Sequence, residues 1–362
     1  MPSTIRAAVC RSFGAPLSIE HLTLADPGPG EVRVRIGAVA ACHGDVSFVD
    51  GEWGGDLPTV VGHEAAGTII GVGEGVGFEL GSPVVVTRIR SCGECDRCQR
   101  GAEVACRTRF LLDDVSPLTD SSGAPVGHGQ RTAAFAEEVV VHASQVVPID
   151  GPVPFESAAL LACGVLTGVG AVVNTAAVEP GSTVVVIGCG GIGLNIVQGA
   201  ALARAATIVA VDPVDSKRDL AVQLGATTSQ PPGPRLAEHV AELTGGAMAD
   251  YVFVATGAAT ALDTIDELAG TMGALVVVGM PPSGVTAKFD PGTLAARNQR
   301  IIGSRMGTSV VARDVPRLVQ RYLDGELELD GLISRRFALD DIDEAFEDVR
   351  RGTALRDVIV FD

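Results

Sequence analysis

The sequence predicts an α/β protein with two domains, one mostly β and one built on a doubly wound parallel sheet. Its 362 residues are too many for one small core. The first 150 residues are rich in short β-like runs between glycines, such as 31–40 and 82–89. From Thr183 onward, apolar strand-like runs alternate with helix-like runs, which is typical of a parallel sheet covered by helices on both faces.

The first domain has further strand-like runs at 65–73 and 134–141. The polar segment from Arg107 to Arg131 is long for a connection inside a compact domain, so we expect a surface excursion there. A helical stretch follows at 155–176.

The second domain alternates regularly, and Gly225 ends one of its helices as a natural C′ residue. After about Gly303 the pattern becomes mixed again. We therefore place the first domain at 1–163 and 304–362, and the second at 164–303. The predicted strands are 183–187, 207–212, 251–257, 274–279 and 357–361, and the predicted helices are 192–205, 215–225, 235–243, 258–270, 315–327 and 340–352.

Composition narrows the class of protein. A net charge of −17 disfavours nucleic acids and anionic membranes as partners. The uncharged stretches 157–178 and 180–203 are interrupted by glycines and lack basic flanks, so we interpret them as buried core. The N-terminus has no apolar signal segment. Eight cysteines without an export signal favour a reducing cytoplasm, where thiols bind metals more often than they form disulfides.

Four of these cysteines lie close together in the lobe 91–107, with the spacing C-x2-C-x2-C-x7-C. Four thiolates so near along a chain favour one closed, tetrahedral, structural zinc site. A disulfide cluster or an iron–sulfur site is the alternative, although an iron–sulfur site favours a different spacing. The cysteines are Cys92, Cys95, Cys98 and Cys106.

A glycine-rich loop indicates a Rossmann dinucleotide site. Gly188, Gly190 and Gly193 form G-x-G-x-x-G after an apolar strand and before a helix, and Gly191 and Ile192 lie between them. The glycines permit a tight turn, close approach of pyrophosphate and helix–strand packing, and the helix N-terminus offers free N–H groups.

Asp212 ends the second strand, 19 residues after Gly193. A carboxylate there binds the adenosine ribose and repels a 2′-phosphate, which favours NAD over NADP. The alternative is an Asp that caps the next helix. Lys217 on that helix could reach the same ribose or be an ordinary solvated lysine.

Cys42, His63 and Cys163 could leave a zinc ion with one open position, the pattern of catalytic sites. Their spacing alone cannot predict that residues 120 positions apart meet at one site, and each of the three could instead be a buried core residue. The order of motifs, however, resembles that of the zinc-dependent medium-chain alcohol dehydrogenases. Within this family the chain resembles the class I/III-like branch, which includes thiol-dependent formaldehyde dehydrogenases. The matching motifs are CHGD, GHEAAG, the four-cysteine lobe, CGVLTG, GCGGIG and LRDVIVF.

This resemblance implies a GroES-like catalytic domain, a Rossmann domain, and two zinc ions per chain. It implies that Cys42, His63 and Cys163 ligate the catalytic zinc, that Asp45 orients His63, and that Glu64 lies behind the zinc. It also implies contacts to NAD from His43, Thr167, Ile192 and Arg356, and a substrate cleft lined by Trp53 and Arg88.

Two positions depart from the family. Gly44 stands where members usually carry the hydroxyl of a proton relay, and we hypothesise a water-filled gap there, with Ser47 helping. Arg88 stands where an aromatic or apolar residue is common in the family. Its guanidinium would favour an anionic or strongly polar substrate, and the alternative is that it turns outward to solvent.

The resemblance predicts an NAD-dependent oxidoreductase in which zinc lowers the pKa of an alcohol and a hydride passes to nicotinamide, or the reverse with an aldehyde or ketone. The alternatives are a formaldehyde dehydrogenase acting on a mycothiol- or glutathione-type adduct, a non-catalytic NAD-binding zinc protein, and an enzyme that never releases its cofactor. A small-molecule substrate and a homodimer or homotetramer joined through the nucleotide domains are expected.

Overall fold

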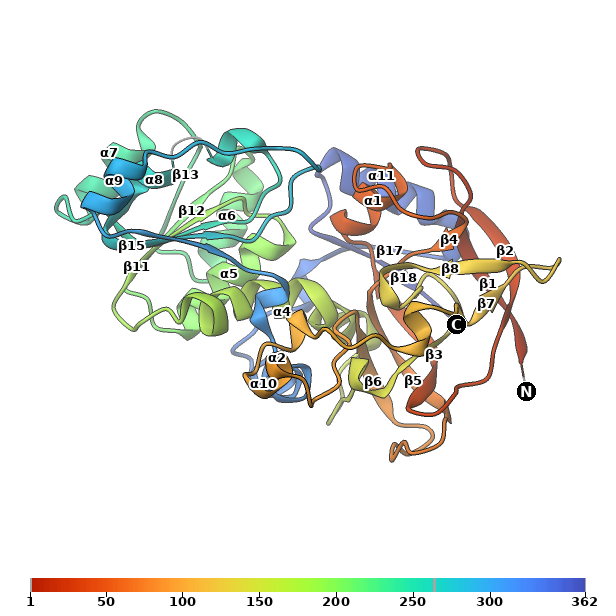
Figure 1. Ribbon diagram of the computed structural model, residues 1–362. Coiled ribbons are helices and arrows are strands. Elements are labelled where there is room, and N and C mark those ends of the chain that lie inside the picture. Colours follow the sequence, from red (N-terminus) through yellow and green to blue (C-terminus); the bar gives the residue numbers. More distant parts are fainter. Residues whose placement is uncertain (1, 263–264, 362) are drawn as a thin grey trace. The chain divides into compact units, whose positions relative to one another are not determined.

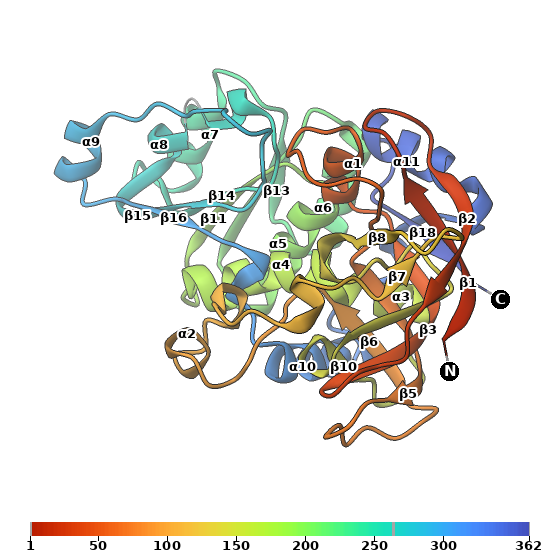
Figure 2. The same cartoon turned by 45° about the vertical axis from the view of Figure 1, so that its right-hand side comes forward.

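A computed structural model describes residues 2–262 and 265–361, shown in two views in Figures 1 and 2. The chain divides into two compact units, one formed by residues up to Gly164 and from Val310 on, the other by Val165–Ser309. Met1 and Asp362 of the predicted first domain, and Asp263 and Thr264 of the predicted helix 258–270, lie outside the described residues.

Unit 1 contains a small closed barrel of five strands in the order β1-β2-β7-β8-β4. Its longest pair, β1 with β2, is antiparallel from Ser3↔Leu24 to Val9↔Ser18. The alternating apolar residues of these strands form part of the core of unit 1. The barrel strands are β1 (Ser3–Cys10), β2 (Ser18–Leu24), β4 (Thr59–Val60), β7 (Leu118–Thr119) and β8 (Pro125–His128).

A second sheet of unit 1 has the order β10-β6-β5-β3-β18-β17, and β9 pairs with β3 beside this path. Strand β18 comes from the C-terminal segment and pairs antiparallel with β3, so both chain segments of unit 1 share one sheet. The strands are β3 (Glu31–Ala40), β5 (Glu64–Val72), β6 (Pro83–Thr87), β9 (Glu138–His142), β10 (Val146–Pro148), β17 (Ile333–Phe337) and β18 (Arg356–Val360).

Short helices of unit 1 position side chains around these sheets. Helix α3 contacts β3 and β5, and α10 contacts β10. The helices are α1 (His43–Val49), α2 (Asp96–Gln99), α3 (Phe155–Leu160), α10 (Val311–Leu323) and α11 (Ile342–Arg351).

Unit 2 is a six-stranded, wholly parallel sheet in the order β13-β12-β11-β14-β15-β16. Val184, Val185 and Val186 of β11 are all fully buried, which shows that both faces of the sheet are covered. The strands are β11 (Thr183–Ile187), β12 (Thr207–Val211), β13 (Thr228–Gln230), β14 (Ala249–Val254), β15 (Ala269–Val277) and β16 (Arg300–Gly303), and the helices are α4 (Leu166–Gly170), α5 (Gly191–Leu202), α6 (Asp215–Gln223), α7 (Leu236–Leu243), α8 (Ile265–Leu268) and α9 (Pro291–Ala296). The predicted α/β fold class is confirmed.

The predicted surface excursion at 107–131 is wrong in part. This segment supplies β7 and β8, and Leu118 and Val126 are buried in the core of unit 1. The two strands have two and four residues, too few for an alternating pattern to be visible in the sequence.

The helical run Phe155–Ala176 is the one candidate among the described residues that is long and apolar enough to cross a membrane. Within its most apolar window, 83% of the residues are buried inside the protein. Two of its turns are π-helical, Leu161–Val165 and Ala171–Ala176. π-Helical turns are frequent at functional sites, and the first one carries Cys163.

Candidate active site

Four buried side chains of unit 1 converge on one point. Cys42 precedes α1, His63 precedes β5, Glu64 is the first residue of β5, and Cys163 lies in the π-helical turn 161–165. Their ligand atoms all lie within 4.8 Å of one another. The structure thus brings together the three residues proposed as zinc ligands, although they come from distant parts of the chain.

Asp45 lies behind His63 and is fully buried in the first turn of α1. Its Oδ1 lies 3.0 Å from Nδ1 of His63 and accepts the Gly62 N–H, also at 3.0 Å, while Oδ2 accepts the Cys42 N–H at 3.2 Å. This arrangement occupies one ring nitrogen of His63 and leaves Nε2 for a metal.

Arg356 of β18 lies beside Glu64, with 3.4 Å between its Nε and Oε2 of the carboxylate. Both side chains are buried, and Nη1 of Arg356 also donates to the carbonyl of Leu355. Gly164 makes room for this guanidinium, because a Cβ there would lie 2.6 Å from Nη2 of Arg356. In this structure Arg356, which the resemblance places in contact with NAD, therefore contacts Glu64.

The cluster is electrostatically suited to a cation. The Cys163 thiol and burial raise the pKa of Cys42. Burial alone would lower the pKa of His63, but the negative charges of Asp45 and Cys42 raise it to about 10. Both carboxylate oxygens of Glu64 lack a hydrogen-bond partner among the described residues. Two sulfurs and one imidazole nitrogen are the ligand types that zinc prefers, so these residues fit a zinc ion.

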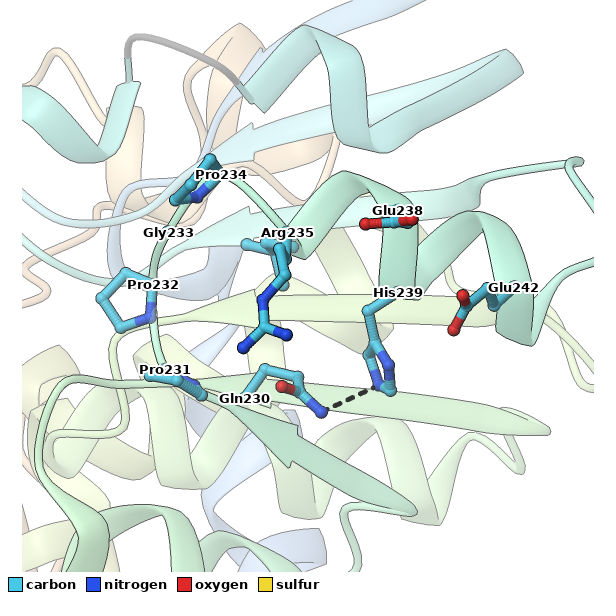
Figure 3. A pocket seen from close by; sticks show the side chains of 10 residues that line it. Gln230, Pro231, Pro232, Gly233, Pro234, Arg235, Glu238, His239 and Glu242 are labelled. Atoms are coloured by element: carbon cyan, nitrogen blue, oxygen red, sulfur yellow. Dashed lines mark hydrogen bonds between the residues drawn. The ribbon is translucent and has the colours of Figure 1, made fainter.

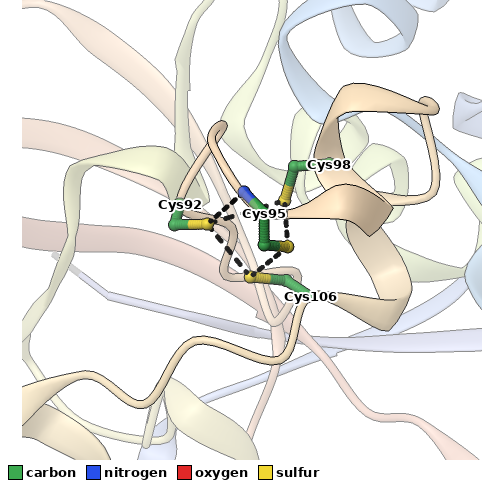
Figure 4. A group of neighbouring side chains, drawn as sticks. All are labelled: Cys92, Cys95, Cys98 and Cys106. Carbon is green, nitrogen blue, oxygen red and sulfur yellow. Dashed lines mark hydrogen bonds between the residues drawn. The ribbon is translucent and has the colours of Figure 1, made fainter.

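The four cysteines of the lobe also converge, as Figure 4 shows. The Sγ···Sγ distances are 3.9 Å for Cys92–Cys98, 3.5 Å for Cys95–Cys98, 3.9 Å for Cys95–Cys106 and 3.7 Å for Cys106–Cys92. A tetrahedron with Zn–S bonds of about 2.3 Å has edges of about 3.8 Å. The Thr108 side chain and the N–H groups of Cys95 and Glu94 lower the pKa of Cys92 to about 6, which favours the thiolate that zinc needs.

In unit 2 the glycine loop runs from β11 into α5. Gly188 has a φ of +93°, which other residues rarely adopt. A Cβ at Gly190 would meet no atom within 4 Å, whereas a Cβ at Gly193 would lie 1.7 Å from the carbonyl oxygen of Gly188. The loop is therefore tight at both ends and open at Gly190, where pyrophosphate would approach. Gly191 is the first residue of α5, and Ile192 follows it with a partly exposed side chain.

Asp212 follows β12 and faces this loop. Its Oδ2 accepts the Cys189 N–H at 2.8 Å and its Oδ1 accepts the Val214 N–H at 2.9 Å. Lys217 on α6 is half-buried, and its charge acts on Cys189. Arg218, which the sequence analysis did not single out, donates from Nη1 to the Asp212 carbonyl at 2.7 Å.

The remaining predicted residues are placed as follows. Thr167 is buried in α4, and its hydroxyl lies 3.7 Å from the sulfur of Met306. His43 is exposed at the start of α1, and Ser47 is buried in the same helix. Arg88 is half-buried and donates from Nη1 to Oε1 of Gln130 at 2.8 Å.

Trp53 lies over Gly44. A Cβ at Gly44 would lie 3.3 Å from Cη2 of Trp53 and 3.8 Å from Sγ of Cys42. The indole ring, rather than the hypothesised water-filled gap, therefore borders Gly44.

A separate hollow in unit 2 follows the end of β13 (Figure 3). Its wall includes the chain from Pro231 to Pro234 and the α7 residues Glu238, His239 and Glu242. Gln230 lies 3.2 Å from His239 through Nε2 of each side chain. None of the residues predicted for catalysis or cofactor binding lines this hollow.

Comparison with known proteins supports this interpretation of both units. Residues 28–151 match the family model described as alcohol dehydrogenase GroES-like domain, and residues 191–324 match zinc-binding dehydrogenase. The chain is 36% identical over 364 residues to NDMA-dependent alcohol dehydrogenase of Amycolatopsis methanolica, with 98% of each protein covered.

Solved structures agree with this result. An alcohol dehydrogenase zinc-binding domain protein from Burkholderia ambifaria is 34% identical, with a TM-score of 0.95 and 100% of both chains covered. Benzyl alcohol dehydrogenase from Acinetobacter calcoaceticus is 31% identical, with a TM-score of 0.92, and the match covers 99% of this chain and 100% of that one. The chain is therefore a zinc-type alcohol oxidoreductase that belongs to the zinc-dependent medium-chain alcohol dehydrogenase family.

Proposed function

We propose that the protein is an NAD-dependent dehydrogenase that transfers a hydride between NAD(H) and a primary or secondary alcohol, or the matching aldehyde or ketone. The observation that carries the proposal is the buried cluster of Cys42, His63 and Cys163 beside a carboxylate with no hydrogen-bond partner among the described residues. We assign one zinc ion to this cluster and a second to the four cysteines of the lobe. The active-site zinc would act as a Lewis acid on the substrate oxygen, and the nicotinamide would exchange the hydride.

The protein residues would position and insulate these groups. Asp45 fixes the ring of His63, and the burial of all four cluster residues keeps bulk water away from their charges. Arg356 pairs with Glu64 and places a positive charge beside this carboxylate next to the ligands.

We infer NAD rather than NADP from the surroundings of Asp212. Its carboxylate is held at the strand end by two backbone N–H groups, and each of its oxygens retains a lone pair for a ribose hydroxyl. A fixed negative charge there repels a 2′-phosphate. Arg218, the nearby cation, is already engaged by the Asp212 carbonyl and the Asp215 carboxylate.

Metal analysis combined with a substrate screen tests the proposal. We expect two zinc ions per chain, and one after either Cys163→Ala or Cys106→Ala. Cys163→Ala should abolish oxidation of alcohols with NAD, and Asp212→Ala should reduce the preference for NAD over NADP. A wild-type chain with one zinc, or with two zinc ions and no activity towards alcohols, aldehydes or ketones, would contradict the assignment. Formaldehyde oxidation that requires a thiol would identify the thiol-adduct dehydrogenase that the sequence also left open.

A second candidate is an alcohol oxidoreductase that keeps its nicotinamide cofactor through every turnover. The observation that favours it is the 36% identity to a relative named for its dependence on NDMA. Denaturing the purified protein should then release about one NAD(H) per chain, and turnover should proceed with NDMA and no added NAD. Purified protein free of cofactor that turns over with added NAD supports the first candidate.

We also propose that the chain assembles into a homodimer or homotetramer through unit 2. Strand β16 is an edge strand, and Ile301 on it is 45% exposed. Met272, Met280 and Phe289 are exposed on the same unit. Unpaired edge strands with apolar side chains are suited to pairing with a second chain. Light scattering should show a dimer or tetramer that Ile301→Lys weakens, and a monomeric wild type would contradict the proposal.

A cytoplasmic location remains part of the proposal. Six of the eight cysteines lie in the two clusters, where zinc binding needs reduced thiols. Fractionation of cells that express the chain tests this location, and recovery outside the cytoplasmic fraction would contradict it.

A further inference from the structure

A hydrogen-bond chain extends from Arg88 to the metal cluster of unit 1. Nη1 of Arg88 donates to Oε1 of Gln130 at 2.8 Å, and Nε2 of Gln130 donates to Oδ1 of Asp45 at 2.9 Å. The same Oδ1 lies 3.0 Å from Nδ1 of His63. Two residues outside the ligand set, Arg88 and Gln130, are thereby linked to the histidine.

The backbone holds Gln130 in an uncommon conformation to make this contact. Gln130 has a φ of +52°, and Arg131 and Ala133 are also left-handed, at +68° and +53°. Residues other than glycine adopt this region at a cost of about 1 kcal/mol or more, so such strain persists only where the surroundings hold it.

The surroundings do hold this segment beside the ligand. The Arg131 carbonyl accepts hydrogen bonds from Nη2 of Arg90 at 3.2 Å and from Nε2 of Gln145 at 2.9 Å. The Thr132 hydroxyl donates to the carbonyl of Gly62 at 2.5 Å, directly before His63. The strained segment is therefore anchored at the two residues that follow Gln130.

Arg88 determines which end of that amide faces Asp45. A guanidinium only donates hydrogen bonds, so it must face the amide oxygen. The amide NH₂ group then points to Asp45 and to the Gly44 carbonyl, 3.2 Å away. A flipped amide would turn its oxygen toward a buried carboxylate, which is unfavourable.

We propose that Gln130, oriented by Arg88, is a positioning residue for the metal ligand His63. It completes the donor set of the Asp45 carboxylate, whose Oδ1 otherwise accepts only from Gly62 and His63 among the described residues. A carboxylate held in this way fixes the plane and the tautomer of the imidazole, with Nε2 directed to the metal. Arg88, predicted to line the substrate cleft, acts through this chain instead.

This inference rests on the proposed zinc site, and zinc release from the holoenzyme tests it. Gln130→Met keeps the length of the side chain and removes its hydrogen bonds to Arg88, Asp45 and the Gly44 carbonyl. When the protein is challenged with a chelator, one zinc should leave about tenfold to a hundredfold faster than from wild type, the effect typical of residues that support a metal ligand. The lobe zinc should leave at the wild-type rate and is an internal reference.

Arg88→Met should act in the same direction, and Arg88→Lys should restore most of the slow release, because a lysine can still donate to Oε1 of Gln130. The double variant should be no worse than Gln130→Met, since both changes break one chain. Gln320→Met is the matched control, because it removes a glutamine–aspartate hydrogen bond of 2.8 Å on α10, outside the metal cluster.

Wild-type release rates for both ions in Gln130→Met, or equal acceleration of both, would overturn the positioning role. A wild-type chain that holds zinc only in the lobe would overturn the proposed function and this inference together, so the two failures are distinguishable.

Discussion

Among changes in the glycine loop, Gly190→Ala is the one that we expect to weaken cofactor binding with the least effect on the stability of the fold. A Cβ at this position would meet no protein atom within 4 Å, and the backbone there (φ −79°, ψ −172°) is open to alanine. Alanine is a poorer N-cap than glycine by roughly 0.5 to 1 kcal/mol, but it restricts the unfolded chain by a similar amount. We therefore expect the stability of the cofactor-free protein to change by less than about 0.5 kcal/mol.

The same methyl group would stand where pyrophosphate approaches the helix N-terminus. Losing one hydrogen bond to a charged group costs about 1.5 to 3 kcal/mol, which corresponds to between about tenfold and a hundredfold weaker binding of NAD. Isothermal titration with NAD measures this loss, and calorimetric unfolding measures stability. If the cofactor copurifies with the protein, the amount of NAD(H) bound to the purified variant is compared with that bound to wild type in place of the titration.

Two glycines serve as controls. Gly77 also has open space around its Cβ position, but it lies in unit 1, so Gly77→Ala should change neither the affinity for NAD nor the stability of the protein. Gly193→Ala should damage folding and binding together, because the carbonyl that its Cβ meets belongs to the backbone. Unchanged affinity for NAD in Gly190→Ala would refute the assignment of this loop to pyrophosphate.

Three further predictions concern unit 1. Gly164→Ala should lower the free energy of unfolding by up to about 2 kcal/mol in calorimetry, because overpacking against Arg356 costs about 1 to 3 kcal/mol and the helix gains only about 1 kcal/mol; a stabilised variant would contradict the contact. Gly44→Ser should displace the ring of Trp53, the single tryptophan of the chain, so an unchanged emission spectrum would count against that packing. Burial raises the pKa of Asp357 to about 6, and its oxygens have no hydrogen-bond partner among the described residues, so ionisation should destabilise the fold increasingly from about pH 4 to about pH 6. Asp357→Asn should then raise the melting temperature at pH 8, where the free energy of unfolding should increase by at most about 3 kcal/mol, and it should leave the melting temperature unchanged at pH 4. Equal effects at both pH values would show that charge is not the cause.

The sequence predicted the four inner strands of the Rossmann unit, because these strands are buried on both faces, but not the edge strands β13 and β16. Runs such as TVVVI and TIVAV are apolar after their first residue. Strand β16 was missed because it lies at the sheet edge, where Arg300 and Gly303 are exposed and the apolar run shortens to two residues. Strand β17 was missed for the same reason, since ISRRF exposes three consecutive polar side chains.

The two metal sites differ in how far the sequence could predict them. The lobe is local, so its spacing alone indicated one closed site. Cys42 and Cys163 meet only because α1 and the π-helical turn 161–165 approach the same end of β5, and no local pattern encodes that approach. The prediction that Cys42 and Cys163 share one metal site came from the family resemblance and not from their spacing.

Gln130 could not have been found in the sequence by any rule of spacing. It lies in a polar segment that reads as a loop, and its left-handed backbone depends on anchors from Arg90 and Gln145. A glutamine gives no sign of function by its residue type, whereas a cysteine or a histidine does. Positioning residues of this kind become visible only when the hydrogen bonds of a buried carboxylate are counted.

The arrangement of charge explains why this cluster belongs to a metal rather than to the core. Glu64 and the thiols of Cys42 and Cys163 can each carry a negative charge, and the Arg356 guanidinium pairs with Glu64. Without a cation the Cys42 thiol keeps its proton, because the Cys163 thiol and burial raise its pKa. A divalent cation removes that requirement and gains the thiolates as ligands, so metal binding and proton release are coupled. Buried ionisable side chains are costly for folding unless they are paired or bind a metal, so a cluster of this kind in a buried place points to chemistry rather than to packing.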